Sequence, residues 1–201
     1  MPAEIAQSLR LRRKVPRDDE RAPQNIDLCL FLVDLDHFKA VNDLHGHGAG
    51  DEVLRQVGEV LLHACRASDV VVRWGGEEFL VLARSSDRSL ARVLAAQICS
   101  AMRTHPFDLG NGEVLRKTCS LGFTAFPLLP SAPERFSWEQ AIELADQCLY
   151  AAKHSGRDGW VRACLLDPGH APGPEVHDLP GYGPAHIVTS LGEVSSLRWK
   201  A

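Results

Sequence analysis

An uninterrupted apolar run over residues 28–33, followed directly by two carboxylates, constrains the fold of this chain more than any other feature. Six apolar residues in succession are typical of a strand that is buried on both faces of a sheet. Asp34 and Asp36 come where this strand must end, and a strand end presents side chains outside the sheet, where a ligand can reach them. We therefore expect a helix-covered sheet with an acidic site at this strand end.

The rest of the pattern mixes helices with strands joined by tight turns. Gly75 and Gly76 separate two β-rich runs and predict a hairpin. Ser137 and Gln140 form the pattern of a capping box, and Gly156 is placed to end the helix that follows. Helices are expected over residues 37–44, 52–65, 89–102 and 137–155, a glycine-rich loop over 46–50, and strands over 70–74, 78–82, 107–109, 114–118, 119–126 and 160–161. This mixture predicts an α+β fold.

The chain is expected to divide into a domain, residues 1–161, and a Pro/Gly-rich C-terminal tail, residues 162–201. The short strand over residues 160–161 is expected to close the domain, because proline and glycine dominate from residue 167 onward. Before the first strand, residues 4–14 have the pattern of an amphipathic helix end and residues 16–25 that of a polar linker.

Charge and composition exclude several classes of partner. With 45% apolar residues among 201, the chain can build a sizeable core. A net charge of -4 favours neither DNA nor contact with an anionic membrane, so any phosphate must be held by a local site. Six cysteines without a CxxC pair are typical of reduced core residues, and no run approaches the roughly 18 apolar residues of a membrane helix. We expect a cytoplasmic location; a membrane anchor elsewhere in a full-length protein stays open.

Acidic residues at two turns predict a magnesium site. Mg²⁺ takes hard oxygen ligands, usually one or two carboxylates with water and phosphate. Asp34 and the carbonyl of Leu35 are candidates at the first strand end, and Glu77, beside the Gly75-Gly76 turn, could complete the site. Two alternatives stay open: the first acids simply cap the next helix, or the glycine turn is an ordinary hairpin with surface acids.

Lys153 and Arg157, four residues apart at a helix end, are candidate phosphate ligands. The alternative is that they only stabilise the helix dipole. His37, His45 and His47 lack the spacing of a zinc site.

Three segments together resemble the GGDEF family of diguanylate cyclases. They are DLDHFK at the first strand end, RWGGEEF at the hairpin and AAKHSGRDG at the helix end, in that family's order and approximate spacing, and the similarity runs over residues 28–161. The resemblance implies a fold like the palm of nucleotide cyclases and polymerases, with a mostly antiparallel central sheet wrapped by helices. It also implies that two GTP molecules are condensed into cyclic di-GMP with release of pyrophosphate, and that Mg²⁺ is required, with Mn²⁺ as an alternative.

The resemblance assigns roles to individual positions. Asp34, Glu77 and the Leu35 carbonyl would hold the metal, and Glu78 would support the metal and the reacting hydroxyl. Asn42 and Asp51 would read the guanine edge, although Asp51 is also a candidate N-cap. The phosphate-binding set implied in this way comprises the backbone amides of His37 and Phe38 and the side chains of Lys39, Lys153 and Arg157.

Arg66 and Asp69 match the family's RxxD inhibitory site at the same offset from the two glycines, which implies product inhibition by cyclic di-GMP. Because the product is two-fold symmetric, catalysis is expected to need a homodimer. The family's TGLxNRR segment is absent, so the chain is expected to be an N-terminally truncated domain without its upstream sensor domain. Two alternatives stay open: a receptor that binds cyclic di-GMP without making it, and an interaction module that binds neither nucleotide.

Overall fold

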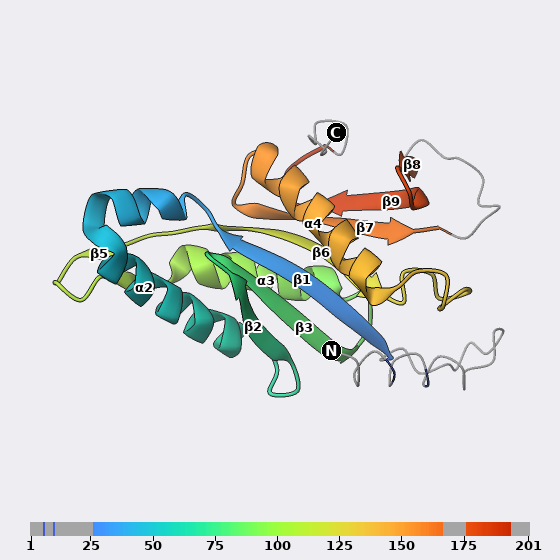
Figure 1. The fold of residues 1–201 in the computed structure, drawn as a ribbon, viewed down its shortest axis with the longest axis horizontal. Helices are drawn as coiled ribbons and strands as arrows, with labels where there is room; N and C mark the ends of the chain where they lie inside the picture. Colours follow the sequence, from blue (N-terminus) through green and yellow to red (C-terminus); the bar gives the residue numbers. More distant parts are fainter. Residues whose placement is uncertain (1–5, 7–9, 11–25, 167–175, 194–201) are drawn as a thin grey trace.

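A seven-stranded sheet in the order β2-β3-β1-β6-β7-β9-β8 forms the frame of the molecule (Figure 1). The computed structural model describes residues 26–166 and 176–193, together with Ala6 and Arg10. The expected N-terminal helix end, apart from those two residues, and the polar linker lie outside the described residues. The strands of the sheet are β1 (Asp27–Leu35), β2 (Val70–Gly75), β3 (Glu78–Ser86), β6 (Cys119–Phe126), β7 (Gly159–Leu165), β8 (Val176–Leu179) and β9 (Gly183–Thr189).

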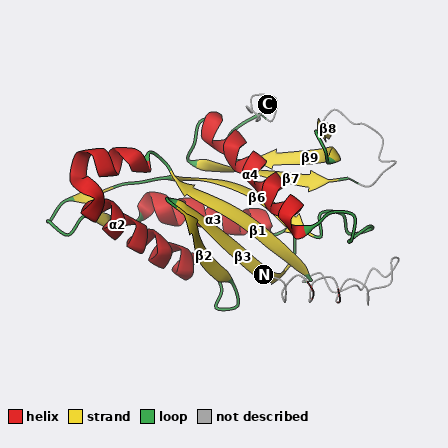
Figure 2. Ribbon diagram, viewed as in Figure 1, coloured by secondary structure: helices red, strands yellow, loops and turns green. Residues whose placement is uncertain are grey.

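Three helices cover the two faces of the sheet. They are α2 (Phe38–Ala64), α3 (Ala91–Thr104) and α4 (Trp138–His154), and a small hairpin of β4 (Phe107–Asp108) and β5 (Val114–Leu115) packs beside α2. Helix α4 contacts β1, β6 and β7, whereas α3 contacts β6 and β7 from the opposite face (Figure 2). Among the paired strands, β6 and β7 are parallel and the other neighbours are antiparallel. The predicted α+β class with a mostly antiparallel sheet is confirmed.

Strand β1 lies near the middle of the sheet, between β3 and β6, and every one of its residues is buried. Alternate side chains enter two cores: Phe31 and Val33 pack toward α2 and α3, while Leu28 and Leu30 pack toward α4. The prediction of a strand buried on both faces is therefore confirmed, and its C-terminal end is fixed from both sides of the sheet.

The capping box at the start of α4 is also confirmed. Ser137 Oγ accepts a hydrogen bond from the Gln140 N–H at 3.3 Å, and Gln140 Oε1 accepts one from the Ser137 N–H at 2.9 Å. Gly156, with a φ of 131°, follows the end of the helix as expected. All six cysteines are free thiols. Among the described helices, none combines the length and apolar character needed to cross a membrane.

The expected glycine-rich loop over residues 46–50 is wrong. The chain from Phe38 to Ala64 is a single element with one break, at Gly46, whose φ of 83° and ψ of 165° are not helical. Glycine tolerates this positive φ, so one residue makes the whole bend while Gly48 and Gly50 stay helical.

The expectation that a strand over residues 160–161 closes the sheet is also wrong. Strand β7 runs to Leu165, so the expected division of the chain at residue 161 falls inside it, and β9 pairs with β7 antiparallel. The C-terminal hairpin is apolar on one face, with Leu179, Ala185 and Ile187 buried against the α4 core. Tyr182 Oη donates a hydrogen bond to the Gln140 carbonyl at 2.9 Å, which ties this hairpin to α4.

Candidate active site

The end of β1 brings three of the predicted site residues together. Asp34 lies directly opposite Glu78 of β3 in the antiparallel register, and its side chain is only 8% exposed. Lys153, in the last turn of α4, places Nζ 2.7 Å from Asp34 Oδ2 and 3.7 Å from Glu78 Oε1. Lys153 therefore does more than favour the helix dipole, because it contacts the acidic residues directly.

The electrostatics of Asp34 show that Glu77 also acts on this position. Burial raises the pKa of the Asp34 carboxyl to about 6, although the hydrogen bond and positive charge of Lys153 lower it. The negative charges of Glu77 and Glu78 raise the pKa further. An added cation would relieve this concentration of negative charge at Asp34.

The candidate oxygen ligands suit a magnesium ion whose remaining ligands would be substrate phosphates and water. No group of three His, Cys, Asp or Glu side chains within the described ranges is arranged as a ready-made metal cage. Magnesium rarely uses such a cage in nucleotide-binding proteins, since one or two carboxylates plus substrate phosphates and water are its usual ligands. Asp34 and Glu77 supply that number of carboxylates, and the Leu35 carbonyl belongs to the same strand end.

The turn from β1 into α2 has the geometry of an anion-binding turn. His37 adopts the left-handed conformation, with a φ of 55° and a ψ of 36°, and its side chain does not cap the helix. A left-handed residue followed by helical residues points successive N–H groups into one concavity, and the first N–H groups of a helix lack partners within it. Lys39, two residues further on, is exposed beside this turn.

Asp36 does not cap α2, which excludes one of the alternatives raised by the sequence. Its buried carboxylate accepts hydrogen bonds from Thr118 Oγ1 and Ser120 Oγ, each at 2.7 Å, and from the Asp158 N–H at 3.0 Å. Asp36 thus joins β1 to β6 and to the loop after α4. This role could not be predicted from the sequence, because the three donors lie far along the chain from Asp36.

The loop after α4 carries Arg157 in a fixed backbone conformation. The Arg157 N–H donates to the Ala152 carbonyl at 3.1 Å, and Arg157 has a left-handed φ of 63°. The next residue, Asp158, is held by the hydrogen bond to Asp36 and by an ion pair with Arg103 at 2.7 Å. The Arg157 side chain is exposed, on the loop that begins where the helix of Lys153 ends.

Asn42 and Asp51 are brought close by the break at Gly46. A Cβ added to Gly50 would lie 1.9 Å from Asn42 Oδ1, so the Asn42 amide rests directly on the backbone next to Asp51. Asp51 itself is exposed and lies within the helix, after its restart. The alternative that Asp51 is an N-cap is therefore wrong, because the helix resumes earlier than the sequence suggested.

Arg66 and Asp69 lie apart from these residues, in the turn between α2 and β2. Asp69 Oδ2 accepts from the Arg66 N–H at 2.9 Å and its Oδ1 from the Arg84 N–H at 3.2 Å, so the carboxylate closes the turn onto β3. A cavity of about 210 Å³ adjoins both residues and is also lined by apolar residues of α3, among them Ala91 and Leu94.

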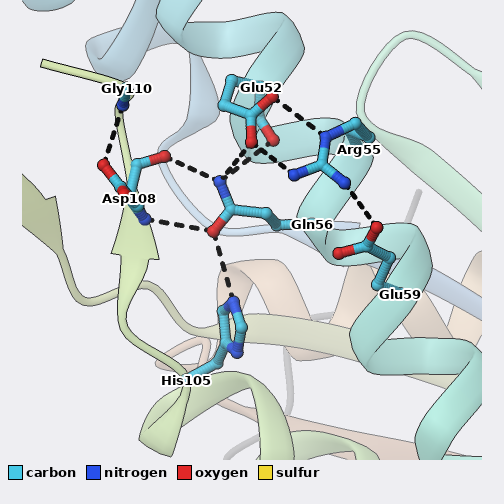
Figure 3. Close-up of polar contacts among 7 residues, drawn as sticks. All are labelled: Glu52, Arg55, Gln56, Glu59, His105, Asp108 and Gly110. Atoms are coloured by element: carbon cyan, nitrogen blue, oxygen red, sulfur yellow. Dashed lines mark hydrogen bonds and ion pairs between the residues drawn. The ribbon is translucent and has the colours of Figure 1, made fainter.

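Gln56 is a buried polar residue that sequence reasoning missed. Its amide nitrogen donates to the Asp108 carbonyl at 2.7 Å, and its amide oxygen accepts from the Asp108 N–H at 3.0 Å (Figure 3). The same oxygen lies 3.3 Å from His105 Nε2. Gln56 thereby fixes the β4–β5 hairpin to the helix that carries Asp51. A lone glutamine 52 residues from its partner offers no local sequence signal.

The fold and the site define a palm-like α+β domain with acids and cations gathered at the end of its central strand. The chain belongs to the family described as diguanylate cyclase, GGDEF domain, whose model matches residues 9–159.

Individual relatives agree with this assignment. The chain is 40% identical over 158 residues to the diguanylate cyclase DgcP of Pseudomonas aeruginosa, covering 79% of this chain and 22% of DgcP. It is 34% identical over 131 residues to the diguanylate cyclase DosC of Escherichia coli, covering 65% of this chain and 27% of DosC. The chain thus spans only about a quarter of the length of these two relatives.

Solved structures show the same fold. The active GGEEF domain of a diguanylate cyclase from Vibrio cholerae superposes with a TM-score of 0.62 at 27% identity, covering 83% of this chain and 92% of that one. The GGDEF domain of DgcB from Caulobacter crescentus, solved in complex with c-di-GMP, gives a TM-score of 0.58 at 30% identity, covering 66% of this chain and 75% of that one. The predicted cyclase-palm fold is confirmed.

Proposed function

We propose that this chain is a diguanylate cyclase domain that condenses two GTP molecules into cyclic di-GMP and releases pyrophosphate. The convergence of Asp34, Glu78 and Lys153 at the end of β1 is the observation that carries this proposal. Membership of the GGDEF family and the names of the relatives support it.

We propose separate roles for the residues of the site. The terminal phosphates lie on the amides of His37 and Phe38, and the phosphate-binding cations are those of Lys39, Lys153 and Arg157. The Asn42 amide can donate and accept at the guanine edge, and the Asp51 carboxylate accepts from the guanine N–H groups. Asp34, Glu77 and the Leu35 carbonyl would hold Mg²⁺ or Mn²⁺, which supplies positive charge to the triphosphate.

The reaction needs two such sites. Each 3′-hydroxyl attacks the α-phosphorus of the other GTP, and pyrophosphate leaves in each of two steps. Glu78, 3.7 Å from Lys153 Nζ, would accept a hydrogen bond from the attacking hydroxyl, and the cations would hold the triphosphate in line. Catalysis would then be mainly positioning and electrostatic stabilisation. One domain binds one GTP, so two copies must meet with their sites facing each other to form a symmetric product.

We further propose that cyclic di-GMP inhibits the domain at Arg66 and Asp69. The exposed Arg66 guanidinium can donate hydrogen bonds to a phosphate and to a guanine. A base can pack against the apolar residues that line the adjoining cavity of about 210 Å³. This cavity also supports a second candidate function, a receptor that binds cyclic di-GMP here without making it.

The test is incubation of the chain with GTP and Mg²⁺, followed by chromatographic and mass-spectrometric identification of the product. We expect cyclic di-GMP and pyrophosphate from the wild type, and a loss of at least about a hundredfold in rate for Glu77→Gln. Glu59→Gln, which removes an exposed acid of α2 that pairs with Arg55, is the matched control and should keep its rate.

Failure to form product, even in a longer chain that carries the remaining regions of its relatives, would contradict the cyclase proposal. Binding of cyclic di-GMP that disappears in Arg66→Ala, without synthesis, would instead establish the receptor function.

A further inference from the structure

Lys117 lies beside the turn at His37 and Phe38, in the segment that leads into β6. Asp34 pairs with Ser120 and Leu35 with Cys119, and the Asp36 N–H donates to the Thr118 carbonyl at 2.9 Å. Continuing this antiparallel register by one residue places Lys117 next to His37. The side chain completes the contact, because Lys117 Nζ donates to the His37 carbonyl at 3.3 Å.

The Lys117 ammonium forms no ion pair with a carboxylate of the described residues. Within the described part of the chain no acid lies at ion-pair distance from Lys117 Nζ, whereas Arg88 and Arg103 are both paired with aspartates. The Asp36 carboxylate is close enough to affect Lys117, but its oxygens already accept from Thr118, Ser120 and Asp158.

The partial burial of the Lys117 ammonium favours the binding of an anion beside it. Lys117 is half-buried, and burial lowers the pKa of its ammonium while the charge of Asp36 opposes that change. A lysine ammonium has three donors, and the His37 carbonyl accepts only one of them. A neutral carbonyl compensates a desolvated charge less well than an oxyanion does.

We infer that Lys117 is a further substrate-binding residue, one that binds the terminal phosphates of the nucleotide on the His37–Phe38 turn. This inference rests on the proposed function, because it assigns the phosphates of GTP to that turn. Lys153 then reaches the triphosphate from α4 and Lys117 reaches it from the segment before β6. The released pyrophosphate carries the same chemistry and binds Lys117 in the same way.

The experiment compares Lys117→Gln with Lys117→Arg and with Arg116→Met. Glutamine keeps an N–H donor for the His37 carbonyl, so it removes the charge without removing the contact. Arginine restores the charge. Arg116→Met removes the same charge from the adjacent residue, whose guanidinium donates to the Thr104 carbonyl at the end of α3 and not to the His37 carbonyl.

Calorimetry with tripolyphosphate, GTP and cyclic di-GMP, all in Mg²⁺, gives the readout. Lys117→Gln should weaken tripolyphosphate and GTP by about tenfold or more, the usual value of a charge-assisted contact. Its affinity for cyclic di-GMP and its thermal unfolding temperature should match the wild type. Lys117→Arg should recover most of the loss, and Arg116→Met should show none.

The outcomes separate this inference from the proposed function. Tripolyphosphate binding that depends on Lys117 in a chain that makes no cyclic di-GMP would uphold the inference and refute the cyclase. Synthesis of cyclic di-GMP by the wild type, together with an unchanged tripolyphosphate affinity in Lys117→Gln, would uphold the cyclase and refute the inference about Lys117. A wild type that neither binds tripolyphosphate nor forms product overturns both, and an equal loss of cyclic di-GMP binding in Lys117→Gln also overturns the inference.

Discussion

Lys153 Nζ lies 2.7 Å from Asp34 Oδ2, and this ion pair joins the last turn of α4 to the end of β1. The ion pair does not fully compensate the desolvation of the Asp34 carboxylate, because burial and the neighbouring acids still raise the pKa of this group to about 6. A charge that is disfavoured in the folded protein, yet placed at the centre of the site, indicates a position kept for function at a cost in stability.

Asp34→Asn should therefore stabilise the protein while abolishing synthesis. Asparagine carries no charge to desolvate, so we expect the free energy of unfolding at pH 7 to rise by about 1 to 2 kcal/mol. Because the folded pKa of Asp34 is raised from 3.8 to about 6, its contribution to stability is complete below about pH 4 and is lost as the pH rises through about 6.

The difference between variant and wild type should consequently be small near pH 4.5 and reach its full size above pH 7. Urea unfolding in the presence of a chelator measures it at each pH. A wild type that is the more stable protein at pH 8 would contradict this account of Asp34.

Gly50→Ala should displace Asn42 and weaken GTP binding. The new methyl group would lie 1.9 Å from Asn42 Oδ1 and 3.1 Å from the Phe38 ring, so the asparagine must leave its position. We expect GTP affinity to fall by about tenfold or more, the value of a lost pair of polar contacts to a base. Gly48→Ala is the matched control, because nothing lies within 4 Å of its Cβ and alanine favours the helix. Equal GTP affinities for the two variants, measured by calorimetry, would count against the assignment of Asn42.

Arg66→Ala should relieve product inhibition without lowering the initial rate. Arg66 is exposed in the turn between α2 and β2, which Asp69 joins to Arg84 of β3, six residues along the strand from Glu78, so its loss should leave the rate within about twofold of the wild type. Initial rates measured against added cyclic di-GMP should stay constant in the variant and fall in the wild type. Arg92→Ala, at another exposed arginine, should remain inhibited. Inhibition that persists in Arg66→Ala would place the inhibitory site elsewhere.

Ending the chain at residue 166 should destabilise the domain. The truncation removes β8 and β9, uncovers the edge of β7, and takes away Ser190 Oγ, which accepts the Trp160 N–H at 2.9 Å. We expect the unfolding temperature to fall by more than about 5 °C, since buried apolar contacts of Leu179, Ala185 and Ile187 are lost as well. Tyr182→Phe, which deletes one hydroxyl, should cost only about 1 kcal/mol. Unchanged thermal unfolding after truncation would show that the hairpin contributes nothing to the fold.

Local signals explain which parts of the molecule could be predicted from the sequence. The buried β1, the hairpin at Gly75-Gly76 and the box of Ser137 with Gln140 each depend on residues that are close together in the chain. The C-terminal hairpin was not predicted because its apolar alternation is short and is interrupted by residues typical of turns. These are Pro180, Gly181, Gly183 and Pro184. The contacts of Gln56, Asp36 and Lys117 escaped for another reason, since each joins segments that only the tertiary fold brings together.

The three hydrogen bonds accepted by Asp36 come from residues 82, 84 and 122 positions further along the chain. The turn at His37 is therefore anchored by segments that are synthesised long after it. A nascent chain, or one cleaved before the loop that follows α4, lacks part of the anchor for this turn and should be inactive. Under the proposed function, incomplete copies of the domain should therefore contribute no cyclic di-GMP.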